Sequence, residues 1–172
     1  MKAGVIFVLL LMLCYAQVTA APFFMVSAAQ ADLLLVSLAI LLVFQGPKVA
    51  MVSLPVIAVL LGFVSDRSPA VLIIALLPLL PLAYWLEEAA PTVARYAQTL
   101  FAVGVTGLWA RTVLSITVFA QGAPVDVGAL IFQVLVPGLI LDLTLLSLAY
   151  LGCRLLGWEP RSLSPARQRY RA

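Results

Sequence analysis

The chain has 172 residues, of which 65% are hydrophobic and 10% are charged, whereas an ordinary soluble domain has roughly 45–50% and about 25%. Its mean hydropathy is +1.17, so the apolar side chains are too many for one core and we expect them to face lipid. This composition excludes a water-soluble globular domain. A membrane span needs roughly 17 to 25 residues, so the chain has room for about six spans.

Six apolar segments separated by turn residues predict an all-α membrane protein, a six-helix transmembrane bundle in one domain over residues 1–157. The expected spans are residues 3–21, 32–45, 49–65, 70–86, 97–119 and 127–153. Pro78 and Pro81 should kink the fourth span, which lipid tolerates only where neighbouring groups bind the freed carbonyls. The longest internal polar connection is expected over residues 87–95, and residues 158–172 are expected to form a basic tail.

The first segment also has features of a signal peptide, since Lys2 precedes an apolar run that small residues end. No charge follows until Asp32, which makes this apolar stretch longer than a typical signal peptide, so a retained helix is favoured over a cleaved one. Cys14 is not expected to carry a lipid, because Leu13 stands where a small residue would precede a lipidated cysteine.

The distribution of Lys and Arg predicts the orientation in the membrane. With the N-terminus inside and six spans, eight of the ten cations lie on the cytoplasmic side: Lys2, Lys48, Arg95, Arg154, Arg161, Arg167, Arg169 and Arg171. Only Arg67 falls in an outer turn, so both termini are expected in the cytoplasm. The arginine-rich end follows an apolar segment, which is typical of attraction to anionic lipid headgroups and not of nucleic-acid binding.

The residue types exclude several kinds of catalytic site. The chain has no His, and its two cysteines, Cys14 and Cys153, both lie inside apolar runs. We therefore expect no metal site and no cofactor. Glu87 and Glu88 lie beside Arg95 at an expected membrane border, where a solvated helix end is a simpler interpretation than an acid–base pair. No phosphate loop, nucleophile elbow or His-based triad is present, so an enzyme is not expected.

Two ionisable residues fall well inside expected spans, Arg111 in the fifth and Asp142 in the sixth. A charge near the bilayer centre costs about 2.5–3.5 kcal/mol on insertion scales, so each needs a partner or a water-filled lining. Helical rise separates the two residues by roughly 7 to 8 Å along the membrane normal. The two side chains are therefore predicted to pair.

Small and polar residues accompany each of these charges at helical spacing. The stripes are Gly104, Gly107, Arg111 and Ser115 on the fifth span, and Gly138, Asp142 and Ala149 on the sixth. Small residues let helix backbones approach closely, so these positions are candidates for a helix interface. Three interpretations stay open: a structural ion pair that locks two helices, a polar seam that binds a solute, a proton or a partner helix, and an Arg111 that snorkels to the outer headgroups.

Four short stretches carry a family resemblance. They are Asp32-Leu33-Leu34-Leu35, Gly46-Pro47-Lys48, the run from Leu61 through Gly62 to Asp66, and the run from Val136 through Pro137 to Asp142. Together with the length, the six spans and the basic end, they resemble the MreD family of bacterial rod-shape-determining membrane proteins. The chain departs from that family at Asp142, where asparagine is usual, and at Ala70, where a glycine is expected.

The resemblance implies a non-enzymatic subunit of the cell-elongation (rod) complex in the bacterial cytoplasmic membrane, supporting lateral peptidoglycan synthesis and cell shape. It implies MreC as the partner, with RodA and a class B penicillin-binding protein in a larger complex and MreB indirectly. The alternative is a small-solute-binding subunit of an energy-coupling-factor transporter, a six-helix fold to which MreD-like proteins are similar. Ala16 and Ala20 would suit docking in that class, but the outer turns offer few polar groups for a solute.

Overall fold

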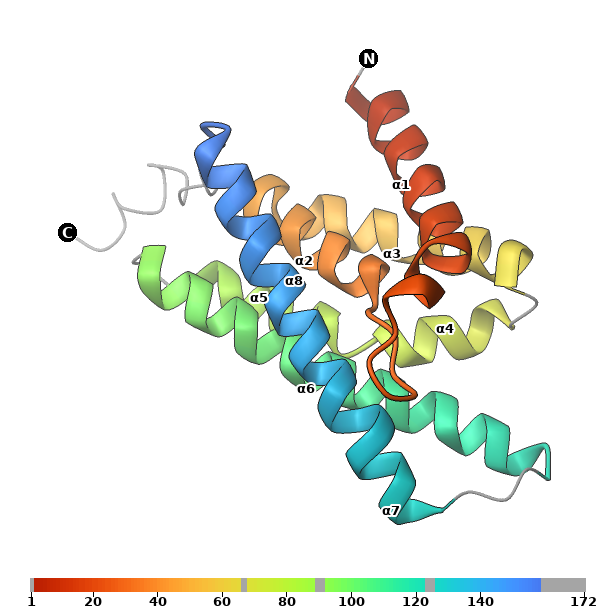
Figure 1. Ribbon diagram of the computed structural model, residues 1–172. Coiled ribbons are helices and arrows are strands. Elements are labelled where there is room, and N and C mark those ends of the chain that lie inside the picture. The colour runs from red at the N-terminus through yellow and green to blue at the C-terminus, as the bar shows by residue number, and fades with distance from the viewer. Residues whose placement is uncertain (1, 66–67, 89–91, 123–125, 159–172) are drawn as a thin grey trace.

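The structure is a computed structural model, and it describes residues 2–65, 68–88, 92–122 and 126–158. Apart from an isolated bridge between Val26 and Ala29, the regular elements within these ranges are helices, so the predicted all-α class is confirmed. In chain order they are α1 (Lys2–Thr19), η1 (Ala21–Phe24), α2 (Leu33–Gln45), α3 (Pro47–Ser65), α4 (Pro69–Leu76), α5 (Leu79–Glu88), α6 (Thr92–Ala120), α7 (Val127–Ala129), the π-helical η2 (Leu130–Leu135) and α8 (Val136–Leu155) (Figure 1).

Three helical segments in these ranges are long and apolar enough to cross a membrane: Pro47–Ser65, Tyr96–Ala120 and Val127–Leu155. The other expected spans contain shorter apolar helices, Phe7–Thr19, Leu33–Gln45 and Pro69–Leu82. The 13 residues of α2 reach about 20 Å, less than the hydrocarbon thickness of about 30 Å. The structure is thus compatible with a membrane protein that has three candidate spans, and the six-span arrangement stays a prediction.

The predicted polar connection over residues 87–95 overlaps the ends of two helices. Helix α5 continues to Glu88 and helix α6 begins at Thr92. A helix satisfies its own backbone, so it can continue past the end of its apolar part, and hydropathy does not mark its last residue. The side chains of Glu87, Glu88 and Arg95, the turn with Asp66, and the tail from residue 159 onward lie outside the described residues.

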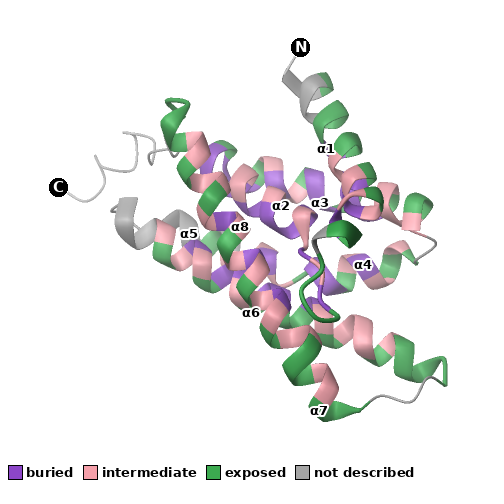
Figure 2. Cartoon of the chain, viewed as in Figure 1, coloured by how far each residue is buried: buried purple, intermediate pink, exposed green. Residues whose placement is uncertain are grey.

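Helix α2 lies at the centre of the bundle, in contact with α1, α3, α6 and α8. Most of its length is buried (Figure 2). It can be buried on several sides because it is almost entirely apolar between its caps, and the Ser37 hydroxyl donates within the helix to the Leu33 carbonyl at 2.6 Å. Gly46 ends the helix with φ of 93°, a left-handed value that favours glycine, and Pro47 begins α3.

Pro78 separates α4 from α5 and leaves one helix carbonyl without its usual donor. A proline has no N–H, so the carbonyl of Ile74, four residues earlier, loses its helical partner. The indole Nε1 of Trp109 on α6 donates to that carbonyl at 3.0 Å. This contact confirms that a neighbouring helix supplies the donor for the predicted kink.

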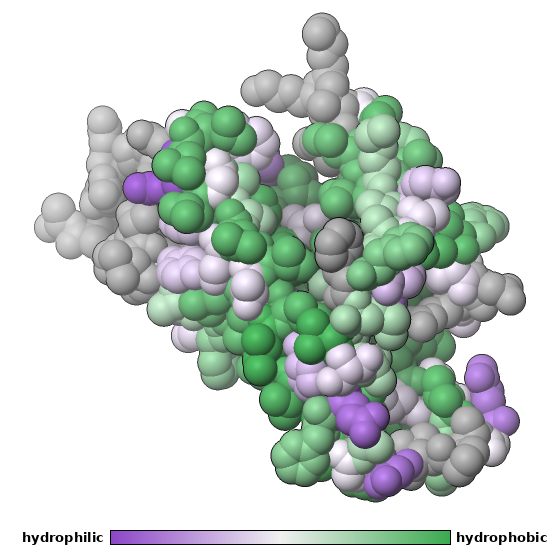
Figure 3. Space-filling model, viewed as in Figure 1, coloured by the Kyte–Doolittle hydropathy of each residue, from purple (hydrophilic) through white to green (hydrophobic). Residues whose placement is uncertain are grey.

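Many of the side chains that the bundle leaves exposed are large and apolar. Met12, Phe63 and Phe132 are 65%, 84% and 75% exposed, and hydrophobic side chains cover much of the face shown in Figure 3. Soluble monomers rarely expose contiguous apolar patches above a few hundred Å². This surface therefore suits a lipid environment.

Candidate functional site

The predicted pairing of the two intramembrane charges is confirmed. The Nη1 of Arg111 on α6 donates to Oδ2 of Asp142 on α8 at 2.6 Å. The Asp142 side chain is 0% exposed and the Arg111 side chain 10%. The guanidinium turns inward to the carboxylate, so the alternative in which Arg111 snorkels to the headgroups is wrong. A buried carboxylate is stable as an ion only when it is paired and hydrogen-bonded.

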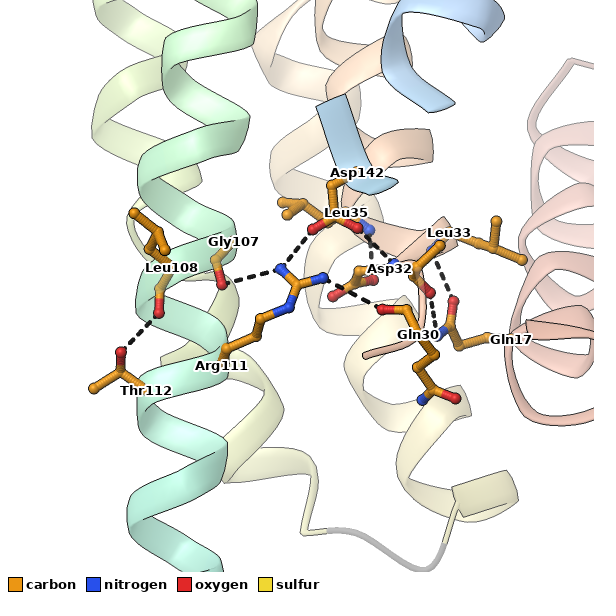
Figure 4. A network of polar contacts seen from close by, with 11 residues as sticks. Gln17, Gln30, Asp32, Leu33, Leu35, Gly107, Leu108, Arg111, Thr112 and Asp142 are labelled. Carbon is orange, nitrogen blue, oxygen red and sulfur yellow. Dashed lines mark hydrogen bonds and ion pairs between the residues drawn. The ribbon is translucent and has the colours of Figure 1, made fainter. Parts of the chain in front are cut away.

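The second oxygen of Asp142 binds the backbone at the start of α2. Its Oδ1 accepts the backbone N–H of Asp32 at 2.8 Å. The Asp32 carboxylate in turn caps α2 by accepting the N–H of Leu35 at 2.9 Å. Both oxygens of the buried carboxylate are therefore satisfied, one by α6 and one by the residue before α2 (Figure 4). Asp32 was expected to begin the second span, and its contact with Asp142 was not predicted.

Gln17 extends the same set of contacts to α1. This side chain is 8% exposed. Its Nε2 donates to the Ala31 carbonyl at 3.0 Å, and its Oε1 accepts the N–H of Leu33 at 2.7 Å. The amide thus binds both sides of Asp32. A lone amide within an apolar first segment was the sequence signal for this role, and it was missed.

Arg111 makes two further, longer contacts. Its Nη1 donates to the Gly107 carbonyl at 3.4 Å and its Nη2 to the Gln30 carbonyl at 3.3 Å. We call Gln17, Gln30, Asp32, Arg111 and Asp142 the polar network (Figure 4). It joins α1, the segment before α2, α6 and α8, so it links four parts of the chain that are distant in sequence.

The predicted stripe of small residues divides into two groups. A Cβ on Gly138 would meet Nε of Arg111 and lie 2.6 Å from its Cζ, and a Cβ on Gly107 would lie 3.1 Å from its Nη1. These two glycines make room for the guanidinium. A Cβ on Gly104 would lie 3.7 Å from Leu139, an ordinary contact, and the Ser115 hydroxyl donates to the Arg111 carbonyl of its own helix at 2.8 Å.

Pro137 leaves a carbonyl free for a contact between the last helix and the segment before α2. Proline has no N–H to donate to the carbonyl of Gln133, four residues earlier, and the chain is π-helical just before Pro137. The backbone N–H of Ala28 donates to that carbonyl at 3.2 Å. Proline thus leaves an acceptor on the last helix that a distant segment uses.

The remaining predicted positions lie apart from this network. Gly62 is a half-buried residue of α3, and Asp66 lies outside the described residues. Cys14 and Cys153 are free thiols. Within the described ranges, no group of three or more Cys, Asp or Glu residues is placed to hold a metal ion.

A cavity of about 770 Å³ lies beside the polar network. It is bounded by the ends of α1 and α3, the segment between α1 and α2, and parts of α4, α6 and η2. All members of the polar network except Asp142 line it. Volumes of 300–1,000 Å³ are typical of ligand pockets, so the network borders a space large enough for a small molecule.

The chain matches no family model, no curated protein and no solved structure.

Proposed function

We propose that this protein is a non-enzymatic, multi-pass subunit of the bacterial rod complex, of the MreD type, which binds MreC and so supports lateral peptidoglycan synthesis. RodA and a class B penicillin-binding protein would belong to the same larger complex, with MreB linked indirectly. The proposal includes the cytoplasmic membrane as location, with six helical spans and both termini inside, because eight of the ten cations then face the cytoplasm.

The hydrogen bond between the Asp32 N–H and Asp142 carries this proposal. These two residues belong to the first and last stretches that resemble MreD, and they are 110 positions apart in sequence. Pro137 belongs to the last of these stretches and cannot donate to the Gln133 carbonyl. That carbonyl accepts the N–H of Ala28, which lies four residues before the first stretch. Two short resemblances that come together in space support a common family more strongly than two that lie apart.

The departure at Asp142 is also consistent with this family. The oxygen that accepts the Asp32 N–H exists in both aspartate and asparagine, so asparagine can make the same contact. The other oxygen of Asp142 pairs with Arg111, and an amide NH₂ in its place would face a guanidinium. We infer that this chain has aspartate at position 142 because Arg111 needs a counterion. The contact with the residue before α2 would be common to aspartate and asparagine.

A network that joins four parts of the chain suits a scaffold. Its ion pair and hydrogen bonds lie inside the bundle, where they hold the helices in fixed positions relative to one another. The exposed surface is largely apolar (Figure 3). A partner would therefore be recognised chiefly through helix packing in the membrane and through short turns.

Affinity purification of the tagged protein from its native membranes in mild detergent, with mass spectrometry of the proteins that accompany it, tests the proposal. Recovery of MreC with other elongation proteins is the expected result. Repeating the purification at high salt separates a complex held by helix packing, which persists, from one held by exposed charges. Recovery of an ATP-binding-cassette pair in place of MreC would contradict the proposal and favour the solute-transport alternative.

A further inference from the structure

The cavity beside the polar network has two chemically different sides. Gln17, Gln30, Asp32 and Arg111 form a polar side, since hydrogen bonds hold them in one cluster. Much of the rest of the wall is apolar. It includes Leu61, Val64, Leu72, Leu114, Val118 and Leu130. Such a wall fits an amphiphilic molecule with one polar end and an apolar body.

The polar network as a whole has more carboxyl groups than cations. Asp32 and Asp142 supply two carboxyl groups, and Arg111 supplies one guanidinium. The short 2.6 Å contact pairs Arg111 with Asp142, which does not line the cavity. Among the described residues, no cation forms an ion pair with Asp32, so a cation entering the cavity would be attracted to its carboxyl group. An anion would face Asp32 and compete with Asp142 for Arg111.

Gln30 adds a hydrogen-bonding group at the same wall. Its backbone carbonyl accepts from Arg111 at 3.3 Å, and its side-chain amide points away from the other network residues (Figure 4). In the ranges that the structure describes, that amide forms no hydrogen bond within the chain. Its oxygen is available to accept from a polar group of a molecule bound along this wall.

We propose that this cavity binds a small amphiphile made of a protonated amine and an apolar body. The ammonium would pair with the Asp32 carboxylate, while the body would pack against Leu61 and Leu114. Binding is by ion pairing, hydrogen bonding and burial of apolar area, with no covalent step. This site goes beyond the proposed scaffold function and does not depend on it.

Three probes with the same phenyl and alkyl body test the charge preference: 4-phenylbutylamine, 5-phenylpentanoate and 4-phenylbutanol. Binding to the full-length protein in detergent is measured by isothermal titration calorimetry, with native mass spectrometry to count bound molecules. We expect one amine to bind, at least tenfold more tightly than the carboxylate or the alcohol. Equal binding of amine and carboxylate, or no binding of the amine, would overturn the proposal.

The variant Asp32→Asn tests the residue. Asparagine is as good an N-cap as aspartate, and the backbone N–H that binds Asp142 is unchanged, so the fold should be retained. We expect at least a tenfold loss of amine affinity. The matched control is Asp126→Asn, the same change at the N-cap of α7, where the side chain is exposed and accepts from Gly128; it should bind as the wild type does.

A third variant tests the cavity without touching the charges. Leu114→Trp adds bulk to the apolar wall and should abolish amine binding while the thermal midpoint stays near that of the wild type. Retained binding in Leu114→Trp, or in Asp32→Asn, would overturn the assignment. Phospholipid found at one copy per protein and not displaced by the amine would also overturn it, because the cavity would then be a lipid site.

Discussion

The two ends of α2 are held in the bundle by different kinds of contact. At its N-terminal end, the polar network joins α1, α6 and α8 through an ion pair and hydrogen bonds. At its C-terminal end, Phe44 packs against Tyr150 and Trp158 with ring centroids 5.8 and 6.1 Å apart, and Tyr150 packs against Tyr96 at 4.8 Å. We call these the network end and the aromatic end.

The two ends should respond differently to the loss of one side chain. In the network, each group satisfies a buried partner, so removing one leaves a charge or a polar atom unpaired in a low dielectric. Aromatic pairs contribute about 0.5–1.5 kcal/mol each and leave nothing unsatisfied when one is weakened. We therefore expect single substitutions to be severe at the network end and mild at the aromatic end.

Arg111→Ala should have the largest effect, because it leaves the fully buried Asp142 without its cation. Breaking a buried pair from one side costs about 3–5 kcal/mol, so the thermal midpoint in detergent should fall by roughly 10 °C. The double variant Arg111→Met with Asp142→Asn is the control, since it removes both charges and keeps an acceptor for the Asp32 N–H. Its midpoint should return close to the wild-type value. A single variant as stable as the wild type would refute the structural pair.

Gly138→Ala should be next in size. A Cβ at this position meets the guanidinium that Asp142 holds in place, so the ion pair has to shift or break. Overpacking of this kind costs about 1–3 kcal/mol. Gly152→Ala is the matched control on the same helix, because nothing lies within 4 Å of its Cβ position. Thermal unfolding should show a lower midpoint for the first variant and an unchanged or slightly higher one for the second.

Asp142→Asn should be milder than Arg111→Ala. The amide oxygen can still accept the Asp32 N–H, and the cation left behind, Arg111, still interacts electrostatically with the carboxyl group of Asp32. A loss of about 1.5–3 kcal/mol is expected, because the hydrogen bond to Arg111 is lost while the one to the Asp32 N–H is kept. A denaturant titration in detergent measures it. A loss as large as that of Arg111→Ala would show that Asp32 does not help to compensate the guanidinium.

Tyr96→Phe should have the smallest effect and test the aromatic end. The change removes the hydroxyl that donates to the Ser147 hydroxyl at 2.7 Å and keeps the ring that packs on Tyr150. Hydrogen bonds between membrane helices average about 0.6 kcal/mol in such experiments, so the midpoint should fall by about 1–3 °C. Tyr84→Phe is the control: its exposed hydroxyl donates to the Met51 sulfur at a long 3.5 Å, and no change is expected. A fall as large as that of Gly138→Ala would erase the difference between the two ends.

Much of the helical pattern and the central ion pair could be predicted from the sequence. Apolar runs and their turn residues locate each of the six helical segments, and a cation and a carboxylate inside such runs have few partners other than each other. The small residues at helical spacing also indicated the side of each helix where Arg111 and Asp142 meet. These small residues were expected to let helix backbones approach closely. Gly107 and Gly138 instead make room for the Arg111 side chain.

The rest depended on contacts that periodicity does not encode. Gln17 is an isolated amide in an apolar segment, yet it binds the start of α2. Asp32 begins an expected span, and its backbone N–H binds the buried carboxylate of Asp142. The last helical residue before the polar connection was also not predicted, because hydropathy reports where apolar residues are and not where backbone hydrogen bonding begins or ends. The cavity has no sequence signature, since it is a space left between elements.

Composition and spacing by themselves determined that this chain is helical and suited to lipid, and that Arg111 needs a partner or a polar environment. Those properties follow from local rules: apolar residues avoid water, and a charge in lipid needs a counterion. Only the tertiary structure decided that Asp142 would also hold the start of α2, that Gln17 would bind beside it, and that a cavity would lie next to them. These arrangements depend on how distant segments meet in space, and no local pattern specifies that.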